Sequence, residues 1–271
     1  MQFSELARSF QQLEETSSRV ALVRILADVF RASSPDEVGP ITYLLQGRIA
    51  PAFVPLEMGM GVQHVATAIA QTYHGSREDV LRRFDQVGDL GTVAGLLAGE
   101  SESSSHTAAQ LSVQAVFGRL VEIASMVGPG NIERKVSAFA QLLSKMDPLS
   151  ATYLPRIPLG VLRLGVGDLT VLDAYSVAHV GDKSLRQRLE RAYNETSDLG
   201  LIGRTLWMRG IEAVDLLSIH VGNPVRPMLA ERLPNAESII AMLGRCAVEN
   251  KYDGFRCQVR SSAPWQDIAC A

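Results

Sequence analysis

The sequence has few cysteines, few aromatic residues and no long apolar run. Its three cysteines, Cys246, Cys257 and Cys270, are odd in number, lie near one end and lack the spacing of a zinc site. They therefore exclude a disulfide framework, and we expect the chain to hold no metal of its own. No apolar run approaches the roughly 18 residues that a membrane helix needs, so we expect no membrane partner. The first residues lack an apolar signal core, which predicts a cytoplasmic protein.

The sequence also lacks a strong excess of charge of either sign, because its formal net charge is −3 at pH 7. This balance excludes a uniformly basic nucleic-acid-binding protein, but not a local basic surface, which is all that the phosphate backbone requires. Two stretches are enriched in basic residues: Arg119, Arg134, Lys135, Lys145, Arg156 and Arg163, then Lys183, Arg186, Arg188, Arg191, Arg204 and Arg209. Solvated helix faces would explain either stretch equally well.

Apolar residues recur at helical spacing from Phe3 to about Leu217. One core-facing stripe consists of Leu22, Ile25, Leu26, Val29 and Phe30. Further helices are expected over residues 35–45, 63–72, 77–84, 111–126, 132–145, 170–178 and 184–193. Glycine-containing turns interrupt the pattern at residues 59–61, 88–91, 128–130 and 165–167. The pattern predicts an all-α domain over residues 1–217 and a different, second part over residues 218–271.

The helical region contains an internal repeat. Its halves, about 1–100 and 108–217, are separated by a serine-rich polar segment. Three short segments of the first half recur about 110 residues later and in the same order. They are Tyr43-Leu44 with Tyr153-Leu154, Gly59-Met60-Gly61 with Gly165-Val166-Gly167, and Asp89-Leu90-Gly91 with Asp198-Leu199-Gly200. The repeat predicts a two-fold pseudo-symmetric arrangement, and with only two copies it excludes a solenoid.

A two-fold helical domain suits a duplex, whose two backbones are related by local two-fold axes. Glycine-rich turns that open a helix present free backbone N–H groups, which bind anions. Arg163 lies beside such a turn at Gly165-Val166-Gly167. The other interpretation, which the local sequence leaves open, is that these glycines merely end helices.

The segment from Glu249 to Arg256 carries the pattern Lys-x-Asp-Gly-x-Arg between flanks of strand-like composition. In an extended segment, Glu249, Lys251 and Asp253 share one face. A lysine between two carboxylates is either an ion-pair cluster on a surface hairpin or a nucleophilic amine. Gly254 permits a tight turn, and the Arg256 guanidinium suits phosphate or ribose oxygens.

This pattern resembles the lysine motif of ATP-dependent DNA ligases, RNA ligases and RNA capping enzymes. The helical region resembles the N-terminal DNA-binding domain of archaeal-type ATP-dependent DNA ligases, and the likeness covers about Phe3 to Arg260. It is carried by Phe3-Ser4-Glu5-Leu6, Thr16-Ser17-Ser18-Arg19, Tyr43-Leu44-Leu45-Gln46-Gly47-Arg48, Glu133-Arg134-Lys135, Leu162-Arg163-Leu164-Gly165-Val166-Gly167 and Pro224-Val225-Arg226-Pro227-Met228-Leu229-Ala230. Residues 218–271 resemble the entry to the ligase adenylation domain, which implies a short β fragment of a nucleotidyltransferase fold.

The resemblance implies a protein that grips nicked double-stranded DNA through the minor groove and both backbones. By position, the DNA-contact candidates are Arg19, Gly47, Gly59, Gly61, Lys135, Arg163, Gly165, Gly167 and Thr170. Lys251 would take AMP from ATP, Glu249 would read the adenine edge, and Arg256 would hold ribose or phosphate. Asp253 and Gly254 would shape the turn at the lysine, and Mg²⁺ would assist as a Lewis acid.

The chain departs from the ligase family in two places. It ends about twenty residues after Lys251, so the remaining nucleotide-pocket motifs have no counterpart, and we expect a truncated chain that is inactive alone. Pro155 and Pro158 lie where the family has a helix, which predicts a kinked or split helix.

Two rival functions remain open. A non-catalytic module that binds DNA nicks or ends would share the helical domain. An RNA ligase or capping enzyme would share the lysine motif but not that domain, which counts against it. We expect a monomer. The sequence leaves open a sliding-clamp partner and the use of NAD or ADP in place of ATP.

Overall fold

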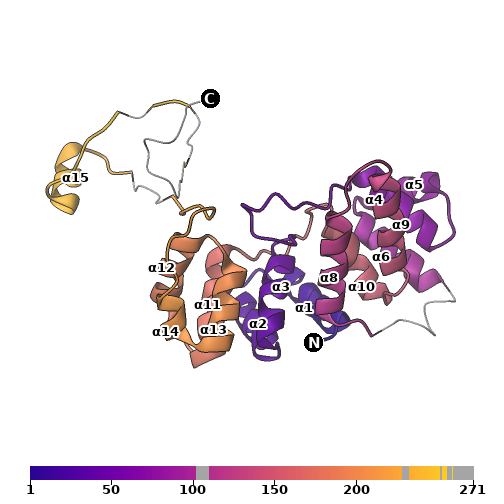
Figure 1. The fold of residues 1–271 in the computed structure, drawn as a ribbon, viewed down its shortest axis with the longest axis horizontal. Helices are drawn as coiled ribbons and strands as arrows, with labels where there is room; N and C mark the ends of the chain where they lie inside the picture. Colours follow the sequence, from indigo (N-terminus) through magenta and orange to yellow (C-terminus); the bar gives the residue numbers. More distant parts are fainter. Residues whose placement is uncertain (102–109, 228–231, 251, 255–257, 259–271) are drawn as a thin grey trace.

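The computed structural model describes residues 1–101, 110–227, 232–250, 252–254 and 258. Every regular element among these residues is a helix, as Figure 1 shows. The prediction of an all-α domain is therefore confirmed. In the part of the chain that is described, no helix has the length and apolar character needed to cross a bilayer.

The helices fall into two series and a separate C-terminal element. The first series is α1 (Phe3–Glu14), α2 (Arg19–Arg31), α3 (Pro35–Leu45), α4 (Val62–Thr72), α5 (Arg77–Val87) and α6 (Leu90–Glu100). The second is α8 (Val113–Ala124), α9 (Asn131–Leu143), α10 (Pro148–Tyr153) with a short 3₁₀ turn η1 (Leu154–Arg156), α11 (Asp168–Val180), α12 (Arg186–Thr196), α13 (Leu199–Arg209) and α14 (Ile211–Asp215). Beyond them, α15 (Ala236–Leu243) lies apart from the helical body (Figure 1).

Local sequence explains where several helices begin. Ser34 and Glu37 form a capping box at the start of α3, and Pro35 occupies its first position, where a missing N–H costs nothing. Asp89 accepts hydrogen bonds from the first amides of α6. Asp198 does the same for α13, so the repeated aspartates are helix caps in both halves.

Helices of the first series pack against helices of the second series. Helix α3 packs against α13 and α2 against α11, while the equivalent pairs α10 with α6 and α9 with α4 form on the other side of the molecule (Figure 1). The pair α3 with α13 thus corresponds to the pair α10 with α6, and the pair α2 with α11 to the pair α9 with α4. The expected two-fold pseudo-symmetry is confirmed. The two halves are intertwined, because each supplies helices to both lobes of the molecule: one lobe contains α2, α3, α11 and α13, and the other contains α4, α6, α9 and α10.

One continuous core fills both lobes. Its largest fully buried side chains include Phe10 and Phe30 from the first half and Phe139, Tyr153 and Tyr175 from the second. The Phe30 and Tyr175 rings lie 4.7 Å apart, between α2 and α11. Aromatic contacts of this kind stabilise the exchanged pairing.

Two sequence expectations meet different outcomes. The kinked or split helix expected at Pro155 and Pro158 is confirmed as a split, because α10 ends at Tyr153, continues only as the 3₁₀ turn and gives way to turns over residues 157–160. Strands were expected around Lys251, but residues 244–250 and 252–254 form none. A strand needs a neighbouring strand for its backbone hydrogen bonds, and these described residues have no such neighbour. Lys251 itself lies outside the described residues.

Candidate nucleic-acid interface

The two glycine turns that open α4 and α11 have the same backbone conformation. Gly59 and Gly165 have φ angles of 63° and 65°, in the left-handed region that favours glycine. Gly61 and Gly167 are extended N-cap residues with φ angles of −86° and −92°. The repeat in sequence is therefore a repeat in geometry.

Both turns leave helix amides available to a ligand. Neither helix start has a side-chain cap, and a Cβ built on Gly61 or Gly167 would meet nothing within 4 Å. All four glycines of the two turns are exposed. Unpaired amides at a helix N-terminus attract anions. Two equivalent anion-binding positions follow, related by the pseudo-two-fold.

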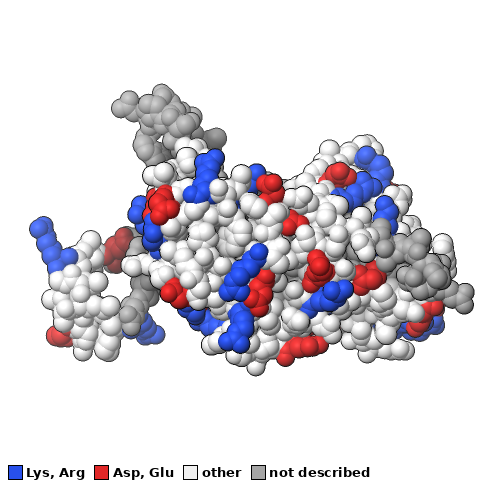
Figure 2. Space-filling model, turned by 90° about the horizontal axis from the view of Figure 1, so that it is seen from below, with Lys and Arg blue, Asp and Glu red and all other residues white. Residues whose placement is uncertain are grey.

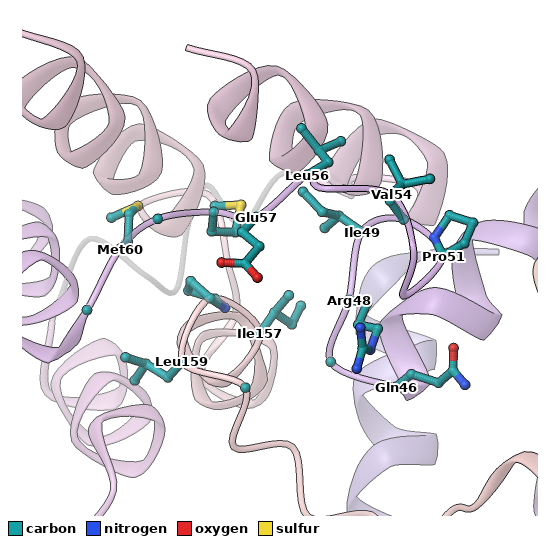
Figure 3. Close-up of a pocket in the computed structure, with 17 residues that line it drawn as sticks. Gln46, Arg48, Ile49, Pro51, Val54, Leu56, Glu57, Met60, Ile157 and Leu159 are labelled. Carbon is teal, nitrogen blue, oxygen red and sulfur yellow. The ribbon is translucent and has the colours of Figure 1, made fainter. Parts of the chain in front are cut away.

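The loops that lead to these turns meet at the upper edge of the molecule in Figure 1, between the two lobes. A Cβ on Gly47 would lie 3.9 Å from the Gly160 Cα, so the two backbones come close. The loops enclose a hollow of about 530 Å³. In Figure 3, Gln46 and Arg48 border one side of it and Met60 the other, with Ile157 and Leu159 between them.

Each loop carries an exposed arginine without an ion pair to the described residues. Arg163 precedes the second turn and was expected from the sequence. Arg48 follows Gly47 directly, and it was not among the candidates although it stands within a segment that carries the resemblance. Unpaired guanidinium groups at both loops can each reach a phosphate oxygen.

Two of the expected DNA-contact residues are buried. Lys135 is 6% exposed, and its Nζ donates to the Met58 carbonyl at 3.0 Å and the Ala124 carbonyl at 3.1 Å. Thr170 is 7% exposed in the first turn of α11. A buried ammonium bonded to backbone carbonyls holds the loop before Gly59 in place. The geometry therefore makes Lys135 a support of the turn, and its expected contact with DNA stays a prediction.

Arg19 lies on the α11 side of the same region. It is the first residue of α2, its side chain is 62% exposed, and its Nη2 is 3.5 Å from the Asp173 carboxylate on α11. Asp173 is buried and pairs more closely with Lys183 and Arg186, at 2.9 and 2.7 Å, so the exposed Arg19 guanidinium can exchange this carboxylate for another anion.

The residues of the lysine motif are only partly described. Glu249, Asp253 and Gly254 are exposed, whereas Lys251 and Arg256 lie outside the described residues. A nucleotide pocket encloses most of its ligand. The exposed residues of this segment do not by themselves form such a pocket. Within the described part of the chain, no group of three or more His, Cys, Asp or Glu side chains is placed to hold a metal ion.

The face of the molecule seen from below carries charges of both signs. Figure 2 shows lysine and arginine interspersed with aspartate and glutamate there, with no large area of one sign among the described residues in view. An interspersed surface gives little net attraction for a polyanion. The features that favour phosphate binding lie at the loops on the upper edge in Figure 1.

Comparisons with known proteins agree with this geometry. The family model described as DNA ligase N terminus matches residues 2–176. A probable DNA ligase of Dictyoglomus thermophilum is 42% identical over 259 residues, which cover 96% of this chain and 44% of the relative. A probable DNA ligase of Persephonella marina is 38% identical over 260 residues, or 96% of this chain and 44% of the relative. A DNA ligase of Saccharolobus islandicus is 38% identical over 268 residues, or 96% of this chain and 45% of the relative.

The chain spans less than half the length of these curated relatives. The family match extends from α1 into α11, and so includes both glycine turns. The resemblance to DNA ligases noted in the sequence is thereby confirmed. The chain belongs to the DNA ligase N-terminus family.

Proposed function

We propose that this chain is the DNA-gripping part of an ATP-dependent DNA ligase that seals nicks in duplex DNA. The observation that carries the proposal is the pair of matching turns at Gly59 and Gly165, each opening a helix and each exposed. Two anion sites related by a pseudo-two-fold match two backbones related by a local two-fold. Contacts to backbone phosphates carry no sequence code, as an enzyme that must seal any sequence requires.

Arg163 and the four turn glycines, with Gly47, Arg48 and Arg19, are the proposed DNA contacts, and Lys135 and Thr170 support them from beneath. At the other end of the chain, Lys251 is the proposed acceptor of AMP, with Glu249, Asp253, Gly254 and Arg256 around the nucleotide. ATP and Mg²⁺ are the proposed cofactors of the longer ligase. The described residues of this segment do not enclose a nucleotide, which supports the proposal that the chain is inactive alone.

A non-catalytic module that binds nicks or ends is the second candidate. It is favoured by the exposure of the described lysine-motif residues Glu249, Asp253 and Gly254. The two candidates differ in one reaction of the longer protein: incubation with labelled ATP labels a full-length ligase covalently at Lys251, and a non-catalytic protein stays unlabelled. We expect no label on this chain. A label that disappears in Lys251→Ala would contradict inactivity. The monomeric state and the cytoplasmic location stay predictions.

Binding to nicked duplex DNA across a salt series tests the DNA-gripping role. The logarithm of the affinity falls with the logarithm of salt, with a slope of about −0.9 per neutralised phosphate. Arg163→Ala should weaken binding and make that slope shallower by about one unit. Arg204→Ala is the matched control, because it removes an exposed arginine that pairs with Asp36 at 3.2 Å on α3. Equal salt slopes for Arg163→Ala and the unaltered chain would contradict the proposed contact between Arg163 and a DNA phosphate.

Lys135→Met separates support of the turn from contact with DNA. Because it leaves two buried carbonyls unpaired, it should lower the free energy of unfolding by about 1–3 kcal/mol. We also expect weaker DNA binding with an unchanged salt slope. A urea melt on the same samples measures the change in stability. A shallower salt slope with unchanged stability would instead show that Lys135 contacts a DNA phosphate directly.

A further inference from the structure

A small polar pocket lies directly behind the second glycine turn. It has a volume of about 240 Å³ and is lined in part by Tyr43, Gln46, Asp168, Tyr193 and Arg226. Asp168 is the first residue of α11, immediately after Gly167. Arg226 comes from the segment that leads out of the helical body toward the lysine motif. The pocket thus joins three parts of the chain: the first loop, the second turn and the outgoing linker.

Arg226 fixes the linker in this pocket by several contacts. Its Nη1 donates to the Asp168 Oδ2 at 2.9 Å and to the Tyr193 hydroxyl at 2.6 Å. Its guanidinium lies over the Tyr193 ring, 4.4 Å from the centroid. Its backbone N–H donates to the Asn194 carbonyl at 2.9 Å. Combined ion pairing and stacking with a backbone hydrogen bond hold a linker far better than any one contact.

The Asp168 carboxylate, at the second turn, accepts hydrogen bonds from the other two parts and from α12. Besides Arg226, Gln46 Nε2 donates to its Oδ1 at 3.1 Å, and the Tyr193 hydroxyl donates to its Oδ2 at 2.7 Å. Gln46 is the residue before Gly47 in the first loop. The linker and the first loop therefore share one acceptor, which belongs to the second turn.

The pseudo-symmetry supplies an internal comparison. The residue after the first glycine turn is Val62, where the second half has Asp168, and the fifth residue before the capping aspartate is Phe84, where the second half has Tyr193. Val62 and Phe84 line an equivalent pocket of about 230 Å³. At these two positions, the pocket that receives the linker arginine has a carboxylate and a hydroxyl, and the related pocket has apolar side chains.

The carboxylate at Asp168 creates an electrostatic conflict. Its side chain is 32% exposed and stands beside the amides that would receive a DNA phosphate. Two anions at one helix N-terminus repel each other, and Val62 poses no such conflict at the first turn. Arg226 places a positive charge against this carboxylate and so removes the conflict.

We propose that Arg226 is a positioning residue that docks the linker on the helical body and, by neutralising Asp168, makes the Gly165–Gly167 turn competent for a DNA phosphate. Linker docking and DNA binding then strengthen each other, since coupling between two binding events is reciprocal. DNA binding therefore stabilises the docked position of the linker that leads toward the lysine motif. This inference rests on the proposed DNA-gripping function.

A double-mutant cycle tests the electrostatic part. The variants Arg226→Ala, Asp168→Asn and the double variant are compared for binding to nicked duplex by fluorescence anisotropy, with Arg204→Ala as control. Arg226→Ala should weaken binding roughly five-fold or more, a typical coupling factor. The double variant should bind like Asp168→Asn alone, because no carboxylate remains to be neutralised. A double variant as weak as Arg226→Ala, or a loss equal to that of Arg204→Ala, would overturn the proposal.

Hydrogen exchange tests docking without relying on DNA. In the free protein, the Arg226 amide should be protected, and Tyr193→Phe and Asp168→Asn should each speed its exchange. If this amide exchanges at the unprotected rate in the unaltered chain, docking is wrong. Saturating DNA should slow the exchange further; an unchanged rate would overturn the coupling. If the chain binds no DNA at all, the proposed function and the coupling fail while the protection of Arg226 still reports on docking.

Discussion

Arg156 lies buried where the two halves meet, and it joins two carboxylates of the first half. Its Nη1 donates to Glu14 at 2.9 Å and its Nη2 to Asp89 at 2.7 Å, with an 11% exposed side chain. The sequence placed Arg156 in a basic stretch that could have been a DNA-binding surface. Its partners come from helices far away in the chain, so local sequence could not reveal that its charge is already used. The same holds for Lys135.

The Arg156 cluster predicts an acid-sensitive stability. Burial by itself would raise the pKa of Asp89, but hydrogen bonds from Arg156 and Thr92 outweigh it and lower that pKa below its ordinary value. A lowered pKa stabilises the fold at pH values above about 4, and this contribution is lost as the pH falls through the folded-state pKa. Arg156→Met should cost about 1–3 kcal/mol at neutral pH, because it removes the charged donor from the half-buried Asp89 and from the more exposed Glu14, where solvent screens the loss.

Urea melts between pH 7 and pH 3 measure this effect. The loss of stability on acidification should be smaller in Arg156→Met than in the unaltered chain, because Asp89 keeps only the Thr92 hydrogen bonds and the lowering of its pKa is smaller. Arg119→Met is a control, since Arg119 pairs with the exposed Glu122 on α8 and with no other carboxylate among the described residues. Identical acid profiles for Arg156→Met and the unaltered chain would contradict the assignment.

At the scale of elements, amphipathic helices were the easiest to predict. The expected helix over residues 35–45 coincides with α3, because a capping box and a proline mark its start. Helices α6 and α13 were not singled out. Both contain glycines and are apolar on more than one face, so their periodicity is weak. Gly91 and Gly95 of α6 and Gly200 and Gly203 of α13 permit close helix packing, which depends on the partner helix rather than on local sequence.

Gly203 in α13 illustrates this packing and makes a prediction. A Cβ there would overlap with the Tyr175 hydroxyl and lie 2.7 Å from the Val38 Cγ1 on α3. Gly203→Ala should therefore lower the free energy of unfolding by about 2 kcal/mol through overpacking. Gly118→Ala in α8 is the matched control, since nothing lies within 4 Å of its Cβ. It should raise stability by roughly 0.5 to 1 kcal/mol, as expected for glycine in a helix interior. Stabilisation by both substitutions in thermal melts would refute the close approach.

At the scale of the whole molecule, the repeat in the sequence predicted the two-fold relation but not the exchange of helices. Short matches show that two units are alike; they do not show which helix of one unit packs on the other. The candidate interface was predicted in part. The glycine turns and Arg163, which the sequence had indicated, lie close together at the loops between the lobes. Arg48, Asp168 and Arg226 became candidates only from their positions in the structure.

The exchange predicts that the halves depend on each other. Residues 1–101 or 110–217, produced separately, would each expose the faces that α3 and α2 or α10 and α9 bury against the other half. Neither fragment should show a cooperative thermal transition alone. Mixed in equal amounts, they should regain helicity and a single transition by circular dichroism, because the intertwined core needs no covalent join. Cooperative melting of either fragment alone would show that a half folds independently.

The same exchange has a consequence during synthesis. Helices α2 and α3 leave the ribosome early, but their partners α11 and α13 follow more than a hundred residues later. At typical elongation rates of about 5–20 residues per second, the early helices wait several seconds with their apolar faces uncovered. The first half is therefore a natural client for chaperones that bind nascent chains, and slower translation before α11 would lengthen its exposure.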